Sequence, residues 1–99
     1  MVQINWTIQA KDDLKSIAEY IKIDSVRYAK LQVIKLKSRT QILKSYQKSG
    51  KIVPEIDNEQ IRELIEWNYR ISYKIISEYQ VDIIAIHHSA RDLEKRVVG

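Results

Sequence analysis

Apolar residues recur every three or four positions in the first half of this 99-residue chain, and this period predicts helices. Ala10, Leu14, Ile17 and Ile21 follow it with charged residues between them, as in an amphipathic helix packed on a core. Thr7 precedes the first of these residues and is of a type that caps helix starts. We therefore expect a helix to begin directly after Thr7.

The same period returns after Asp24-Ser25, which offers a second helix cap, and it continues towards Ser49-Gly50, where we expect the helix to end. The apolar positions of this second helix are Val26, Ala29, Val33, Leu36 and Leu43. A helix of this length has to bury its apolar side, so the two helices are predicted to pack as an antiparallel hairpin.

The pattern becomes extended in the second half of the chain. Residues 61–67, 69–77 and 81–88 are rich in Ile, Val, Tyr and Trp and are separated by short polar turns, which indicates a three-stranded antiparallel meander. Residues 2–6 alternate apolar and polar side chains and predict an N-terminal strand at a sheet edge. Residues 83–86 are apolar on both faces, so their strand is expected inside the sheet.

The order strand, helix, helix and three strands predicts an α+β fold with one mostly antiparallel sheet and the helical hairpin on one of its faces. A chain of 99 residues is long enough for one core, so we expect a single domain over residues 1–99.

Charge is distributed unevenly along the chain. The segment from Arg27 to Lys51 holds eight lysines and arginines and no acidic residue, whereas the whole chain has a net charge of only +4. On the expected second helix, Lys30, Lys37, Lys44 and Lys48 follow one another at steps of seven, seven and four and so form a stripe beside its apolar side. We take these four lysines and Lys51 as candidate binding residues. A stripe of this kind is typical of a surface that binds a polyanion or an acidic protein, although a solvated helix face is the alternative.

Composition excludes several classes of function. The chain has no cysteine, which excludes disulfides and thiol nucleophiles and fits a cytoplasmic location. With two glycines and one proline it has no glycine-rich phosphate loop, and no apolar run is long enough to span a membrane. We expect neither a metal site nor a cofactor.

Several segments together resemble one family of small proteins. They are Trp6 at the end of the first strand, Val53-Pro54-Glu55, Tyr69-Arg70-Ile71-Ser72-Tyr73 and the segment from His87 to Leu93. In this order and spacing they are similar to the RelE/ParE superfamily of toxins from bacterial toxin–antitoxin modules. The resemblance implies a toxin that arrests growth and is silenced by an antitoxin in a hetero-oligomer.

Two activities are known in that superfamily. In the YoeB-like branch, which cuts mRNA on the ribosome, the resemblance implies catalytic roles for Glu55, Arg70 and His87 or His88. Such a ribonuclease needs a base, an acid and a cation for the phosphate. YoeB-like chains close with a His-Tyr pair, whereas this chain continues through Ser89-Ala90-Arg91. The RelE-like variant of the ribonuclease relies instead on clustered Lys and Arg and on a Tyr close to the C-terminus, and this chain has no tyrosine after Tyr79.

The ending of this chain instead resembles ParE relatives, whose target is DNA gyrase and whose mechanism is binding. On that basis Arg91 is a candidate binding residue, and we favour the gyrase-directed toxin over the ribonuclease. A non-toxic basic binding module is the third possibility.

Strand alternation adds expectations about single residues. Arg70 is predicted to point away from the core, and His87 and His88 should point to opposite faces, so at most one of them serves a common site. Arg62 is a further candidate binding residue, although an ion pair with Glu66 is the more conservative interpretation. Trp67 and Tyr69 flank Asn68 and are expected to pack within the hairpin.

Overall fold

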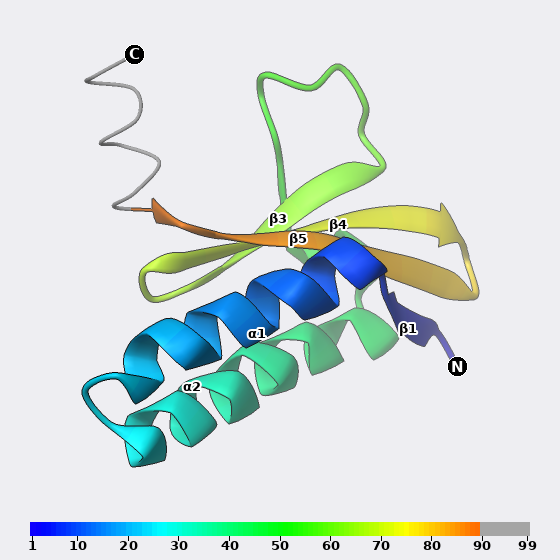
Figure 1. The fold of residues 1–99 in the computed structure, drawn as a ribbon. Helices are drawn as coiled ribbons and strands as arrows, with labels where there is room; N and C mark the ends of the chain where they lie inside the picture. The colour runs from blue at the N-terminus through cyan, green and yellow to red at the C-terminus, as the bar shows by residue number, and fades with distance from the viewer. Residues whose placement is uncertain (90–99) are drawn as a thin grey trace.

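The computed structural model of the chain describes residues 1–89 and confirms the α+β fold (Figure 1). In chain order the elements are β1 (Gln3–Trp6), α1 (Ile8–Lys22), α2 (Val26–Arg39), the 3-10 helices η1 (Thr40–Lys44) and η2 (Gln47–Ser49), β2 (Lys51–Ile52), β3 (Ile61–Glu66), β4 (Tyr69–Ser77) and β5 (Gln80–His88). Both predicted helix caps are confirmed, because the side chains of Thr7 and Ser25 accept the backbone N–H groups of Ala10 and Tyr28.

The strands form one sheet in the order β1-β5-β4-β3-β2. All neighbours are antiparallel except β1 and β5, which run parallel with Gln3 opposite Gln80 and Trp6 opposite Ile83. The predicted edge position of the first strand is therefore confirmed, and the strand that holds residues 83–86 lies between β1 and β4 as predicted. The short strand β2 was not predicted from the sequence, and it gives the sheet a fifth strand at its other edge.

The two helices lie side by side on one face of the sheet (Figure 1). The core between the layers is built from the apolar side of the helices and from one face of β3, β4 and β5. Its fully buried members include Leu36, Leu64, Ile71, Tyr73 and Ile83. This packing leaves the opposite face of the sheet, which carries Arg70 and Ser72, available for a site.

Side chains of α1 complete the hydrogen bonding of β5 where β1 stops. β1 reaches only to Ile83, and β5 has an extra residue, Ile84, at an irregularity in its pairing with β4. The Thr7 hydroxyl lies 2.8 Å from the carbonyl oxygen of Ile83, to which it donates, and a carboxylate oxygen of Asp13 accepts the N–H of Ile86 at 2.9 Å. These bonds satisfy backbone groups on the edge of β5 that β1 leaves unpaired, and they hold this edge against α1.

The second helix does not continue to Ser49 as predicted. The α-helix ends at Arg39, and two 3-10 helices follow. Thr40 is fully buried, and its hydroxyl donates to the carbonyl oxygen of Lys37 at 2.7 Å, in competition with the α-helical bonding of that turn. Lys44 and Lys48 therefore do not lie on the same helix face as Lys37, although their spacing in the sequence predicted this.

Within residues 1–89, none of the helices has the length and apolar character that crossing a membrane requires.

Candidate functional site

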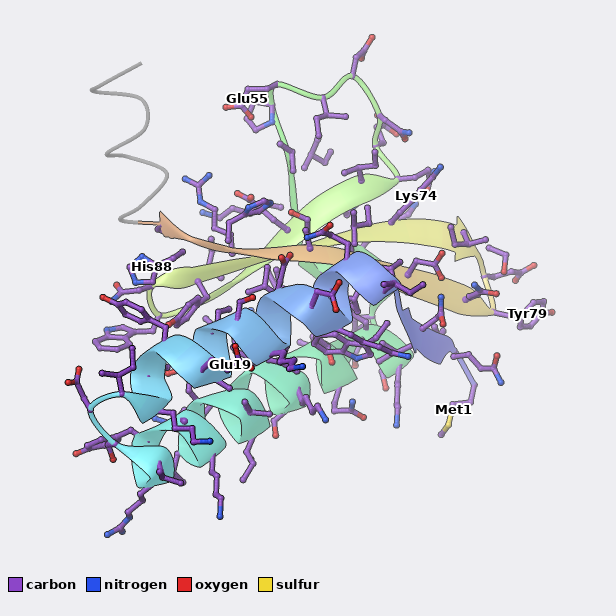
Figure 2. All side chains as sticks on the ribbon, in the orientation of Figure 1. Met1, Glu19, Glu55, Lys74, Tyr79 and His88 are labelled. Carbon is purple, nitrogen blue, oxygen red and sulfur yellow. The ribbon has the colours of Figure 1, made fainter. Side chains whose placement is uncertain are left out.

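The face of the sheet away from the helices carries a cavity of about 450 Å³, which we call the sheet-face cavity. Three of the predicted ribonuclease residues line it, namely Glu55, Arg70 and His87. The prediction that Arg70 points away from the core is confirmed, because Arg70 alternates along β4 with the buried Tyr69 and Ile71. Figure 2 shows Glu55 on the side of the sheet opposite the helices.

Two strands and one loop hold these three residues. Arg70 of β4 lies opposite His87 of β5 in the sheet register. Glu55 belongs to the loop between β2 and β3, whose backbone is braced by bonds such as Ile61 N–H to the Asn58 carbonyl oxygen at 3.1 Å. The cavity therefore brings together a carboxylate, a guanidinium and an imidazole, which are the groups that acid–base chemistry on a phosphate ester uses.

His88 does not belong to the sheet-face cavity. Its ring meets the ring of Tyr69 edge to face on the helix side of the sheet, with ring centres 5.1 Å apart and an angle of 81° between the planes. The prediction that His87 and His88 point to opposite faces is confirmed, and only His87 can act with Arg70 and Glu55. Among residues 1–89, no group of three or more His, Cys, Asp or Glu side chains is arranged to hold a metal ion.

Arg62 has a structural role, but the predicted ion pair with Glu66 is wrong. The Arg62 guanidinium donates to the carbonyl oxygens of Glu59, Lys48 and Gly50 at 3.0, 3.2 and 3.1 Å. Glu66 lies instead 3.9 Å from Nε of Arg39. Arg62 thus joins β3 to the turn before β2, and the carbonyl oxygens of that turn take the place of the expected carboxylate.

The five candidate binding lysines are all exposed. Lys30 and Lys37 lie on α2, whereas Lys44, Lys48 and Lys51 lie beyond its end in η1, η2 and β2. The basic segment therefore has two parts, a helical part and a part that runs on to the sheet edge. The remaining candidate, Arg91, lies outside the described residues, as does the tail after Ser89.

The seam between the two helices forms a second hollow, which we call the hairpin groove. It consists of two adjoining depressions of about 520 and 540 Å³ that share Lys15, Ala18 and Val33. The floor is apolar, and Val26 and Ile34 contribute to it. Five lysines and a single glutamate line the groove: Lys11, Lys15, Lys22, Lys30, Lys37 and Glu19.

The three lysines of α1 that line the hairpin groove were not predicted as site residues. Lys11, Lys15 and Lys22 alternate with acidic residues along the sequence and so give no excess of positive charge there. Their steps of four and seven place them on one side of the helix, and a comparison of helix faces would have found them.

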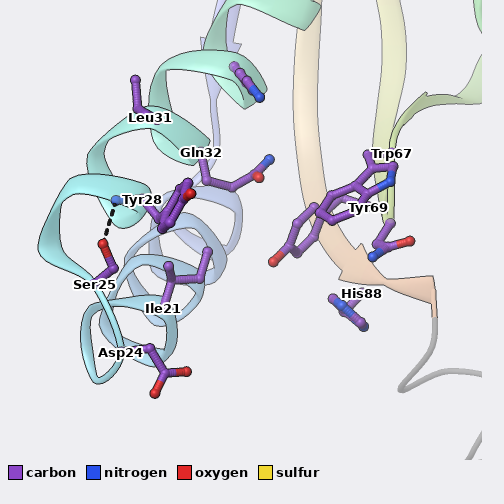
Figure 3. A pocket seen from close by; sticks show the side chains of 11 residues that line it. Ile21, Asp24, Ser25, Tyr28, Leu31, Gln32, Trp67, Tyr69 and His88 are labelled. Carbon is purple, nitrogen blue, oxygen red and sulfur yellow. Dashed lines mark hydrogen bonds between the residues drawn. The ribbon is translucent and has the colours of Figure 1, made fainter.

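A third hollow, which we call the aromatic cleft, lies where the β3–β4 turn approaches the start of α2. Tyr28, Trp67, Tyr69 and His88 line it (Figure 3). The expectation that Tyr69 packs in the core is confirmed, since only 6% of it is exposed, but the same expectation for Trp67 is wrong, because 79% of it is exposed. The turn consists of Trp67 and Asn68 themselves, and this removes Trp67 from the strand that would have buried it.

Comparison with known proteins agrees with this architecture. The model of the family described as the ParE toxin of the type II toxin–antitoxin system parDE matches residues 4–93. A solved structure described as the chromosomal ParDE toxin–antitoxin system from P. aeruginosa has the same fold, with a TM-score of 0.71 and 20% sequence identity over 89% of this chain and 96% of that one. A search of curated proteins found no match.

The fold and the family match define a toxin of a type II toxin–antitoxin module, and the partner of such a toxin is an antitoxin. Within that class, the chain belongs to the ParE toxin family.

Proposed function

We propose that this toxin arrests growth by binding DNA gyrase and that an acidic antitoxin silences it in the cytoplasm. The observation that carries the proposal is the match of the ParE family model to residues 4–93. The resemblance of the chain to ParE relatives, whose target is gyrase, supplies the target. Inhibition by binding needs an exposed and chemically distinctive surface, and this chain has several surfaces of that kind. Inhibition by binding does not need a catalytic group.

The hairpin groove supports the acidic character of the antitoxin. Its apolar floor between α1 and α2 suits the apolar side of an amphipathic helix, and its lysines suit carboxylates along the edges of that helix. Charge complementarity of this kind speeds association and selects the partner. We therefore place the antitoxin in the hairpin groove rather than along the whole basic segment.

The docking surface can be tested with charge reversal. The double variant Lys30→Glu, Lys37→Glu should weaken binding of the antitoxin encoded beside this toxin, and the salt dependence of binding should become shallower. Lys74→Glu is the matched control, because Lys74 is also exposed but lies on the other side of the sheet (Figure 2). Equal affinities for the double variant, the control and the natural chain would remove the hairpin groove from the proposal.

The target is tested with purified components. The natural chain should inhibit supercoiling by purified gyrase and increase the amount of cleaved DNA that gyrase holds, and Arg70→Ala should act in the same way. A chain that binds its antitoxin but leaves gyrase untouched would refute the gyrase target while leaving the toxin–antitoxin assignment intact.

One observation favours a second candidate function, which is ribosome-dependent cleavage of mRNA. Glu55, Arg70 and His87 line the same cavity, as that reaction requires. Within residues 1–89, however, no hydrogen bond or ion pair fixes any of these three side chains, whereas catalytic groups are normally held in place by their neighbours.

The ribonuclease can be tested on programmed ribosomes. If it operates, Arg70→Ala should reduce mRNA cleavage by orders of magnitude, because stabilising charge on a reacting phosphate commonly contributes several kcal/mol. Lys74→Ala, which changes a cation on the same strand outside the sheet-face cavity, should have little effect. Equal cleavage by the natural chain and Arg70→Ala would exclude this mechanism.

A further inference from the structure

Trp67 adopts a backbone conformation that a tryptophan rarely takes. It is the one residue other than glycine with a positive φ among residues 1–89, at 52°. Two-residue turns between antiparallel strands favour Gly, Asn or Asp at such positions, and a bulky side chain there is strained. Backbone strain of this kind is common at binding sites, where a correctly placed side chain matters more than a small loss in the stability of the fold. Trp67 is also largely exposed, so core packing does not account for it.

The aromatic cleft beside Trp67 has the size and lining of a ligand site. Its volume is about 580 Å³, within the range of small-molecule pockets. Tyr28 stands across the cleft from Trp67 and Tyr69 (Figure 3). A flat ring that enters between them would meet aromatic side chains on both sides.

The polar groups of the cleft come mainly from one side of α2. Tyr28, Gln32 and Lys35 follow one another at steps of four and three residues, so they share a helix face. The amide nitrogen of Gln32 is buried and has no hydrogen-bond partner among the described residues. Because this nitrogen is buried, a ligand cannot contact it directly, and Tyr28 and Lys35 are the polar groups of this helix face that a ligand can reach. Lys35 adds a positive charge, and among residues 1–89 Asp24 is the one acid that lines the cleft.

We propose that the aromatic cleft binds an unstacked base of single-stranded nucleic acid. The base stacks on Trp67 and faces Tyr28, and Lys35 contacts the adjoining phosphate. Exposed aromatic side chains beside basic residues are the elements with which proteins hold single strands. The basic segment from Arg27 to Lys51 begins at this cleft and has no acid to repel a phosphate backbone. The exposed ring of Trp67, rather than the charge, favours a nucleic-acid base over an acidic protein ligand here.

This inference goes beyond the action on gyrase and does not depend on it. A gyrase-directed toxin without the cleft would still bind its target, and a chain with the cleft would bind single strands in the absence of gyrase.

The test is a titration of a fluorescently labelled short oligothymidylate with the full-length chain at physiological salt, followed by anisotropy. Trp67→Asn should weaken binding by about tenfold or more, because the stacking of one base is lost. Trp67→Phe keeps an aromatic ring and should retain most of the affinity of the natural chain. Lys35→Ala, which removes one phosphate contact, should weaken binding less. A duplex of the same length, whose bases are not available for stacking, should bind more weakly than the single strand.

Tyr79→Asn is the matched control. Tyr79 is 67% exposed and lies in the β4–β5 turn at the other end of β5 from His88, so it offers an aromatic ring without a cleft (Figure 2). Asparagine tolerates a positive φ, so Trp67→Asn should fold at least as well as the natural chain, and a thermal melt of each variant verifies this. Binding that is undetectable, equally strong for the duplex, unchanged in Trp67→Asn or equally reduced in Tyr79→Asn would overturn the proposal.

Discussion

The backbone N–H of Gly50 donates a hydrogen bond to the phenol oxygen of Tyr73, and the two atoms are 2.9 Å apart. The phenol in turn donates to the carbonyl oxygen of Gln47 at 2.6 Å. Tyr73 lies in the middle of β4 and is fully buried, whereas Gln47 and Gly50 belong to the irregular segment after α2. One side chain of the sheet therefore fixes the path by which the chain leaves the helices and enters β2.

We expect Tyr73→Phe to lower the free energy of unfolding by about 1–3 kcal/mol, because the buried N–H of Gly50 would lose its acceptor. Urea denaturation followed by circular dichroism measures the change. Tyr79→Phe removes a hydroxyl from an exposed tyrosine and should leave the midpoint unaltered.

Gly50→Ala should also destabilise the chain, in this case for steric reasons. A Cβ at this position would lie 2.6 Å from Cε1 of Tyr73 and 2.8 Å from the carbonyl oxygen of Glu63. The φ of Gly50 is −75°, which any residue adopts, so lack of space is the whole reason for glycine here. We expect a loss of about 1–3 kcal/mol by denaturation. Ser45→Ala, an exposed position of the same irregular segment, should behave like the natural chain.

The same tyrosine makes stability depend on alkaline pH. Burial raises the pKa of Tyr73 above its ordinary value of 10.0, and the hydrogen bond from Gly50 and the charge of Arg62 offset this only in part. The folded chain therefore holds the phenol proton more tightly than the unfolded chain. Its contribution to stability is complete below about pH 10 and is lost as the pH rises through the folded pKa.

Denaturation of the natural chain and of Tyr73→Phe at a series of alkaline pH values tests this linkage. The stability of the natural chain should fall more steeply above about pH 10 than that of the variant. Parallel curves for the two proteins would show that Tyr73 does not contribute to the alkaline limb.

Asp13→Ala should remove a hydrogen bond that joins α1 to β5. Its carboxylate accepts the N–H of Ile86 beyond the end of β1, and without it this N–H has no acceptor from α1. We expect a loss of about 2 kcal/mol in the free energy of unfolding and faster hydrogen exchange at Ile86. Asp12→Ala changes the exposed neighbour and should do neither.

Trp67→Gly should stabilise the chain. Glycine adopts a φ of 52° without strain, and the exposed indole contributes little packing that could be lost. Relief of the strain should raise the free energy of unfolding by about 1 kcal/mol. A lower thermal midpoint for Trp67→Gly would mean that the indole contributes contacts that outweigh the strain.

The order of the main elements could be predicted from the sequence because each half of the chain keeps one hydrophobic period. The end of α2 could not, because apolar residues continue at helical spacing through Leu43 while the buried hydroxyl of Thr40 tightens the turn. β2 has only two residues, which are too few to show a hydrophobic period. Its position next to β3 depends on hydrogen bonds that Gly50 makes with Arg62 and Tyr73, and both residues come later in the sequence than β2.

The candidate sites were predicted in part. Strand alternation was enough to place Arg70 on the open face and to separate His87 from His88. It could not show that Glu55 approaches them, because the position of a loop depends on contacts that leave no pattern in the sequence. Trp67 was expected as the last residue of the strand but is the first residue of the turn. A shift of one residue is enough to move a side chain from a buried to an exposed position.

The parallel pairing of β1 with β5 sets the order in which the chain can complete its fold during synthesis. Gln3 to Trp6 are synthesised long before their partners, Gln80 to Ile83. Until then the first strand has no neighbour and α1 has no sheet edge to cover, so the last native contacts span almost the entire length of the chain. We therefore expect a chain released before β5 has been made to lack the native sheet, so that toxicity begins only after Ile83 has been added.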